Sequence, residues 1–182
     1  MADRYTQVVI LCEDYMHFNF ARRYLIQRGI EGRRIRGNVA PSGRGAGSQY
    51  VLNGYPKEVK AIRSRGYLRA GLVAVVDADV CSVQQRLRQF DDALVESRQS
   101  GRVETERIAL LAPKRNVETW VFHLLGNEVN EEDDYKRHVA PSSLKRAIDA
   151  FADVCPSKAA DISVPSLRHA CKELTAFLSR GT

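Results

Sequence analysis

The feature that most constrains the fold is a short apolar run, VAVV at residues 73–76, which leads into Asp77 and Asp79. An unbroken apolar run of this length is typical of a strand that is buried on both faces of a sheet. Such a sheet needs helices on both sides, so the run predicts an α/β protein. Open α/β sheets bind their ligands beyond the carboxyl ends of the strands, which is where these two aspartates are expected.

Strand and helix patterns alternate along the chain, which predicts a mostly parallel, four-stranded, Rossmann-like sheet with helices on both faces. A C-terminal helical extension should follow this α/β domain, which we place at residues 7–126. Residues 127–182 are expected to comprise an acidic, mobile insert at 128–134 and C-terminal helices packed on the same domain. Strands are expected at 7–12, 34–40, 73–79 and 107–112. Helices are expected at 15–28, at 49–65 with an interruption at 53–56, and at 83–97, 117–125, 142–154 and 165–180.

Charge is unevenly distributed along the 182 residues, although the formal net charge is only +6. Residues 1–72 carry 13 Lys and Arg against 5 Asp and Glu, whereas residues 73–135 carry 7 against 13. An acidic centre beside a basic N-terminal portion suits a metal site that faces a polyanion such as nucleic acid. Arg-rich surfaces are also common in Arg-biased proteomes, so the basic portion has a second explanation.

The composition, 44% hydrophobic and 27% charged, is ordinary for a soluble globular protein. No apolar segment approaches the roughly 20 residues that span a bilayer. The first residues, MADRY, lack the layout of a signal peptide, so we expect a cytoplasmic protein that does not enter a membrane. The four cysteines show no metal-binding spacing and are expected to be packing residues, with a redox or ligand role left open for Cys12 and Cys81.

Carboxylates are expected at the carboxyl edge of the sheet after three different strands. Glu13 follows the first strand, Asp77 and Asp79 follow the third, and Glu118 opens the helix after the fourth. If the third strand continues to residue 79, its two aspartates share a side-chain direction and converge on one cation. We therefore expect Mg²⁺ or Mn²⁺ on Glu13, Asp77 and Asp79, which favours phosphoryl chemistry. As an alternative, Glu118 is an ordinary acid in the first turn of a helix.

Basic residues near these acids are expected to act on a phosphate backbone. Lys114 would neutralise negative charge that builds up at phosphorus. As an alternative, it is a solvated loop residue. The glycine-rich loop at 41–48 resembles a phosphate cradle, but it lacks the P-loop pattern, so a lid or a flexible linker is an equal alternative. The residues expected to contact nucleic acid are Arg22, Arg23, Arg44 and Arg115.

The histidines give a weaker signal. His17 lies one helical turn after Glu13 and could approach a metal there, but we expect it to be a surface residue of the helix. His123 and His169 are expected to be structural. No Ser/His/Asp or Cys/His triad can be assembled from the sequence.

The order of Glu13 after the first strand and Asp77-Ala78-Asp79 after the third resembles the Toprim superfamily, over roughly residues 7–126. The segment PKRNVETW at 113–120 is similar to a segment of small stand-alone Toprim-like proteins, related to the OLD-type nucleases, that accompany ATPases in bacterial anti-phage systems. Glu13 is followed by Asp14, where that family commonly has glycine. The resemblance implies a Toprim-like fold, with Glu13 as general base or metal ligand, Asp77 and Asp79 as metal ligands, and Glu118 as a supporting acid.

A metal-dependent nuclease that cleaves DNA or RNA, as the effector of an anti-phage defence system, is the function we expect. The alternative is a non-catalytic Toprim-like module that binds nucleic acid or an ATPase partner. A phosphatase on the same sheet is a third hypothesis, but phosphatases with the D-x-D pattern place it after the first strand. Homo-oligomerisation is compatible with each of these hypotheses.

Overall fold

The computed structural model describes residues 5–43, 46–66 and 68–181, and within them it confirms the predicted α/β architecture. The described residues form four strands and six α-helices, joined by loops and short 3₁₀ turns. The strands are β1 (Gln7–Cys12), β2 (Ile35–Val39), β3 (Ala70–Val75) and β4 (Ile108–Leu111). The helices are α1 (Tyr15–Gln27), α2 (Gly47–Ser64), α3 (Val83–Glu96), α4 (Val117–Leu124), α5 (Leu144–Val154) and α6 (Pro165–Ser179).

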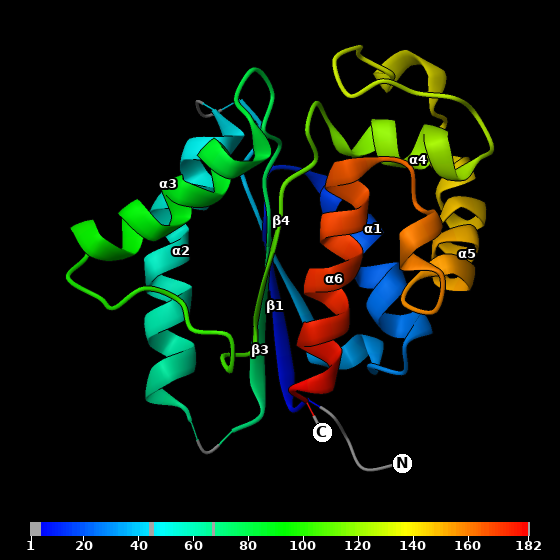
Figure 1. The fold of residues 1–182 in the computed structure, drawn as a ribbon. Helices are drawn as coiled ribbons and strands as arrows, with labels where there is room; N and C mark the ends of the chain where they lie inside the picture. Colours follow the sequence, from blue (N-terminus) through cyan, green and yellow to red (C-terminus); the bar gives the residue numbers. More distant parts are fainter. Residues whose placement is uncertain (1–4, 44–45, 67, 182) are drawn as a thin grey trace.

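All four strands are parallel and lie in the order β2-β1-β3-β4, the arrangement of a Rossmann-like fold. Helices α2 and α3 cover one face, and α1, α4, α5 and α6 cover the other (Figure 1). After β1 the chain forms β2 on one side of β1, and it then crosses to the other side of β1 to form β3. The order in which strands are added therefore reverses between β1 and β3. That reversal makes the carboxyl ends of these two strands a topological switch point.

The alternation of side chains along each strand divides the apolar interior into two cores. In β3, Val73 and Val75 join the core beneath α1 and α6, whereas Leu72 and Ala74 join the core beneath α2 and α3. Every residue of β3 is buried, as the unbroken apolar run predicted. Burial on both faces fixes the register of this strand, because a shift by one residue would exchange the two sets.

Local sequence signals set the helix boundaries close to the predicted ones. The Asn116 side chain caps α4 by accepting a hydrogen bond from the backbone N–H of Thr119 at 3.1 Å. Gly126 ends the same helix with a φ of 95°, a conformation that glycine adopts without steric cost. Both roles follow the prediction.

Helix α2 differs from the prediction, because it runs without interruption through Pro56. A proline inside a helix removes one backbone hydrogen bond and normally breaks or kinks it. Here Val51, Tyr55 and Val59 recur every fourth residue and are completely buried in the core beneath α2 and α3. This packing on both sides of Pro56 explains why the helix continues.

The acidic insert, residues 128–134, is tied to the protein at three points and is not the freely solvated loop that we expected. Glu131 accepts hydrogen bonds from the backbone N–H (3.1 Å) and the hydroxyl of Ser166 at the start of α6. Glu132 lies 3.5 Å from the Lys114 ammonium, and Asp134 accepts a hydrogen bond from Asn116 at 3.0 Å. These partners come from distant elements, so the sequence alone gave no signal for them.

Two of the four cysteines form a disulfide, Cys155–Cys171, which corrects the prediction that all four are packing residues. The pair joins the end of α5 to α6, two elements whose proximity the spacing in sequence does not reveal. Cys12 is a packing residue: it is completely buried, and burial raises the pKa of its thiol to about 12. Disulfides are rare in the reducing cytoplasm, so the bond does not favour the expected location. Among the described helices, none is long and apolar enough to cross a membrane.

We predict that Gly71→Ala lowers the free energy of unfolding by about 1–3 kcal/mol. A Cβ atom at this position in β3 would lie 2.7 Å from ring atoms of both Phe177 and Tyr5, which are stacked with centroids 4.6 Å apart. Urea denaturation measures the effect. Gly101→Ala is the matched control, because its Cβ would meet no atom within 4 Å among the described residues. Equal stability of the two variants would contradict the packing argument.

Ser166→Ala should cost about 1–3 kcal/mol of stability, because it leaves a buried donor without its partner. The indole N–H of the fully buried Trp120 donates to the Ser166 hydroxyl at 2.7 Å. Ser179→Ala, an exposed hydroxyl at the other end of α6, serves as the comparison. Thermal melting curves that coincide for the two variants would show that the indole hydrogen bond does not stabilise the fold.

Candidate functional site

The paired ends of β1 and β3 bring Glu13 and Asp77 together at the switch point of the sheet. Cys12, the last residue of β1, lies opposite Val75, the last residue of β3. Glu13 and Asp77 follow within two residues, and the backbone N–H of Asp77 donates a hydrogen bond to Oε1 of Glu13 at 2.7 Å. The predicted proximity of these two acids is therefore present in the structure.

His17 is buried in the structure, so the prediction that it is a surface residue of α1 is wrong. Only 1% of it is exposed, and its Nε2 lies 2.8 Å from Oδ1 of Asp77. Its Nδ1 lies 2.9 Å from Oδ1 of Asp14. This is a close ionic contact, but its geometry is not that of a hydrogen bond. His17 thus connects the first turn of α1 to the end of β3.

One sequence signal could have revealed the burial of His17. It lies three and four residues before Phe20 and Ala21, on the same buried stripe of α1. Asp14 caps that helix by accepting hydrogen bonds from the backbone N–H groups of Met16 (2.8 Å) and His17 (3.0 Å). The cap fixes the first turn of α1, and with it the imidazole ring.

The charged groups of the site shift each other's pKa values. Burial, followed by the Asp77 charge, raises the pKa of Glu13 from 4.5 to about 7. Burial alone would lower the pKa of His17, but the charges of Asp77 and Asp14 raise it well above its usual value. The contact with His17 outweighs burial at Asp14 and lowers the pKa of that carboxyl to about 2. The site therefore holds an imidazolium between two carboxylates, beside an acid that titrates near neutrality.

Asp79 does not join this group, because the condition for its convergence with Asp77 is not met. Strand β3 ends at Val75, and Asp79 adopts a φ of 52°, so the chain turns instead of continuing as a strand. The charge of Asp79 still contributes to the raised pKa of Glu13, as the smallest of its causes. The Lys114 ammonium lies 3.4 Å from the carbonyl oxygen of Asp79.

Glu118 and Arg115 lie at the same edge of the sheet, in the segment that leads from β4 into α4. Glu118 is in the first turn of α4, where burial raises its pKa and the charges of Asp77 and Asp14 add to the effect. This electrostatic coupling indicates that Glu118 borders the acidic group. Its position is that of an ordinary acid in the first turn of a helix, and its role at the site stays a prediction.

The start of α2 closes the site on the side of Glu13. A Cβ atom on Gly47 would lie 2.9 Å from the Glu13 Cβ and 3.0 Å from its Oε2, so only glycine allows this close approach. The glycine-rich loop at 41–48 therefore ends against the site, with its last two residues inside α2. Arg44 lies outside the described residues.

A divalent cation fits part of the predicted ligand set. The described residues form no group of three or more His, Cys, Asp or Glu side chains suited to a metal, and the metal site of Glu13, Asp77 and Asp79 stays a prediction. Described hydrogen bonds engage Oε1 of Glu13 and Oδ1 of Asp77, and none engages the second oxygen of either. Mg²⁺ is commonly held by one or two carboxylates together with water and substrate phosphates. Glu13 and Asp77 fit an ion that is shared with a substrate.

Comparisons with protein-family models, curated proteins and solved structures gave no match for this chain. No family is therefore assigned to it.

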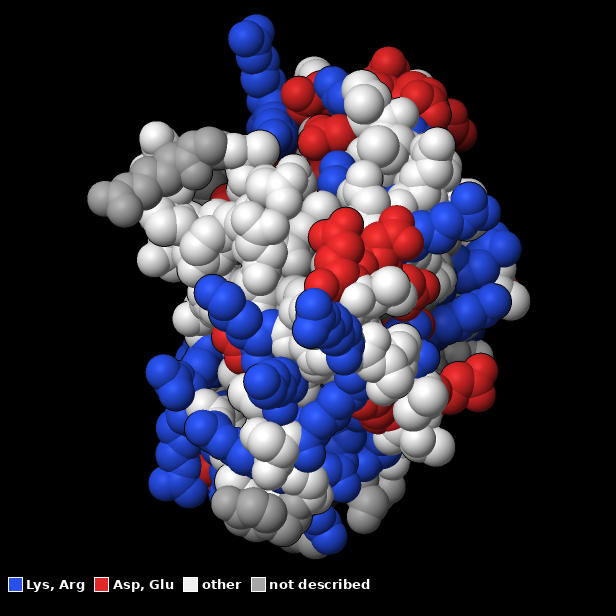
Figure 2. Space-filling model, turned by 90° about the vertical axis from the view of Figure 1, so that its left-hand side faces the viewer, with Lys and Arg blue, Asp and Glu red and all other residues white. Residues whose placement is uncertain are grey.

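The residues that were predicted to contact nucleic acid do not all lie at the carboxyl edge of the sheet. Arg22 and Arg23 line a shallow hollow between α1 and α5, where Lys145 and Asp149 also lie. On the α2/α3 side of the molecule, Lys and Arg gather towards the amino ends of the strands, whereas acidic residues occupy its middle and upper part (Figure 2). The largest basic surface in this view thus lies away from the carboxyl edge that holds Glu13 and Asp77.

The pKa shifts predict a stability that depends on pH through Glu13. A raised folded-state pKa favours the native state fully below 4.5, and this contribution is lost as the pH rises through about 7. Glu13→Gln, which keeps an acceptor for the Asp77 N–H, should match the wild-type protein at pH 4 and exceed its stability at pH 8 by about 1–3 kcal/mol. The raised pKa of His17 changes stability in the same direction, and His17 is present in both proteins.

Thermal unfolding in EDTA at the two pH values measures this difference. Glu96→Gln, at an exposed position of α3, controls for the loss of one negative charge. A stability difference between Glu13→Gln and wild type that is the same at pH 4 and pH 8 would refute the raised pKa.

Proposed function

We propose that the protein hydrolyses phosphodiester bonds of DNA or RNA with the help of Mg²⁺ or Mn²⁺. The observation that carries this proposal is the meeting of Glu13 and Asp77 at the switch point of the sheet, where the backbone N–H of Asp77 donates a hydrogen bond to Oε1 of Glu13 at 2.7 Å. Open α/β sheets bind ligands at such points. Carboxylate oxygens there suit a divalent cation and the phosphate that it binds.

Asp77, Glu13 and His17 would have different roles in such a reaction. Asp77, with Glu13 beside it, would hold the ion, which when bound polarises a phosphoryl oxygen and activates water. Glu13 has a pKa near neutrality and is therefore suited to accept a proton from the attacking water. His17 orients Asp77 through the 2.8 Å contact and balances its charge.

Lys114 and Arg115 supply positive charge at the same edge. The Lys114 ammonium, held between the Asp79 carbonyl and Glu132, would stabilise negative charge on the phosphoryl oxygens after exchanging Glu132 for the substrate. Arg115 would contact a neighbouring phosphate. Glu118 would support the acidic group from the first turn of α4.

The order of the Toprim-like motifs supports the same reaction class. On that resemblance the biological setting we propose is an anti-phage defence system, in which an ATPase partner controls the nuclease. The hydrolysis itself can be tested with the purified protein.

Asp77→Asn should reduce metal-dependent cleavage by roughly 100-fold or more, because it removes a negatively charged ligand while keeping an acceptor for His17. The measurement is cleavage of plasmid and single-stranded nucleic acids with Mg²⁺, Mn²⁺ or EDTA. Asp92→Asn, at an exposed position of α3, is the matched control. Cleavage by Asp77→Asn at the wild-type rate, or cleavage that persists in EDTA, would end the proposal.

A second candidate function is a module that binds nucleic acid or a partner without catalysis. It is favoured by the lack of a three-ligand metal group in the described part of the chain. In that case, binding of an oligonucleotide would persist in EDTA and weaken steeply with salt, while no metal would produce cleavage. Metal-dependent cleavage that Asp77→Asn abolishes would exclude this function.

A further inference from the structure

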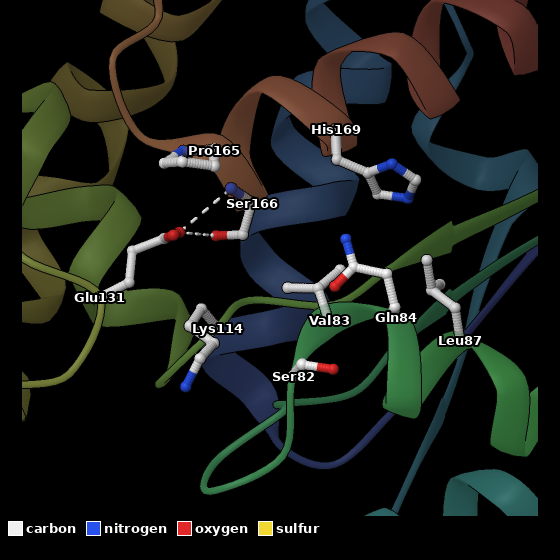
Figure 3. Close-up of a pocket in the computed structure, with 9 residues that line it drawn as sticks. All are labelled: Ser82, Val83, Gln84, Leu87, Lys114, Glu131, Pro165, Ser166 and His169. Atoms are coloured by element: carbon white, nitrogen blue, oxygen red, sulfur yellow. Dashed lines mark hydrogen bonds between the residues drawn. The ribbon is translucent and has the colours of Figure 1, made fainter.

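A hollow of about 270 Å³ lies between the start of α3 and the start of α6, next to the loop that carries Lys114 (Figure 3). Val83 and Leu87 from α3 form one apolar wall, and Pro165 from α6 lies opposite them. The Gln84 side chain points into the space between these walls (Figure 3). The hollow therefore combines apolar sides with a hydrogen-bonding group.

The lining excludes an anion as the natural occupant. Glu131 contributes a carboxylate to the hollow, and Lys114 is the one Lys or Arg among its described lining residues. His169 also lines the hollow, but burial lowers the pKa of its imidazole, which is therefore neutral at pH 7. One cation beside one carboxylate gives no net attraction for a phosphate or a carboxylate ligand.

A purely apolar occupant is disfavoured as well. Nε2 of His169 is buried without a hydrogen-bond partner among the described residues, and an apolar occupant would leave it unpaired, which costs free energy. The chemistry of the walls instead suits a flat, neutral group with apolar faces and polar edges, which describes a nucleobase.

The position of the hollow connects it to the candidate site. Ser82, at its rim, lies three residues after Asp79, and the Lys114 side chain forms its wall on that side. The Lys114 ammonium reaches the Asp79 carbonyl at 3.4 Å. A nucleotide with its base in the hollow would therefore place its phosphate outside the hollow, where the Lys114 ammonium lies beside Asp79 at the carboxyl edge of the sheet.

We propose that this hollow is a nucleobase subsite, which holds a base of the nucleic-acid strand next to the phosphate that is cleaved. The inference rests on the proposed function. It has a consequence for the substrate: a base inside the hollow cannot be stacked or paired, so the hydrolase prefers single-stranded or unpaired nucleic acid.

The first test measures binding without catalysis. AMP, CMP, GMP and UMP, and a short single-stranded oligonucleotide, are titrated into the protein in EDTA by isothermal titration calorimetry. Val83→Trp fills the hollow and should weaken binding of both kinds of ligand at least tenfold. Val95→Trp, a valine on the same helix that is 68% exposed, is the matched control and should bind like the wild-type protein.

The second test measures cleavage by the wild-type protein with Mg²⁺. A single-stranded oligonucleotide should be cleaved at least tenfold faster than the same strand with abasic residues, and faster than the corresponding duplex. Methyl p-nitrophenyl phosphate, a diester without a base, reports the chemical step alone.

The outcomes separate the subsite from the hydrolase. Equal binding by Val83→Trp and Val95→Trp, or equal cleavage of normal and abasic strands, overturns the subsite even when Asp77 proves essential for cleavage. Binding that Val83→Trp abolishes, without cleavage of any substrate by the wild-type protein, supports a base-binding hollow and overturns the hydrolase. Mononucleotide binding that the oligonucleotide does not compete with would assign the hollow to a free nucleotide and overturn the strand proposal.

Discussion

The parallel pairing of β1 with β3 is the constraint on which the site depends. It places Cys12 opposite Val75 and thereby brings the two acids that follow these strands within reach of one hydrogen bond. The pairing is itself held by burial on both faces, since every residue of β3 is buried and its side chains from Leu72 to Val75 alternate between two apolar cores. A slip in register by one residue would exchange the side chains between the two cores and separate Glu13 from Asp77 at the same time. Fold stability and site geometry are therefore specified by the same strands.

His17 supplies positive charge that offsets the repulsion between the carboxylates of the site. Carboxylates at close range disfavour each other's ionisation, which is the second cause, after burial, of the raised pKa of Glu13. The imidazolium of His17, between Asp77 and Asp14, provides an internal counter-charge that is fully buried. On the proposed function, a divalent cation that is shared with a substrate would add a second counter-charge to these carboxylates.

Sequence patterns predicted those features that depend on local periodicity and on strand order. The all-parallel sheet, the limits of β1 and the caps of α4 follow from apolar runs and from Asn116 and Gly126. Features that depend on tertiary packing were missed. The burial of His17, the disulfide and the ties of the acidic insert each need a partner from a distant element. Asp79 was misplaced because a single left-handed residue ends the strand-like path, and no pattern in the sequence indicates where that turn occurs.

The contact between Glu132 and Lys114 gives the acidic insert a consequence beyond structure. The Glu132 side chain is 79% exposed and lies 3.5 Å from the ammonium, so dissolved ions screen this pair easily. Rising ionic strength therefore releases Lys114 while it weakens the long-range attraction of any polyanion. These two effects oppose each other, and the availability of the lysine becomes a function of the salt in its surroundings. On the proposed function, the insert would compete with a substrate phosphate for Lys114, and the ionic strength would set how strongly it competes.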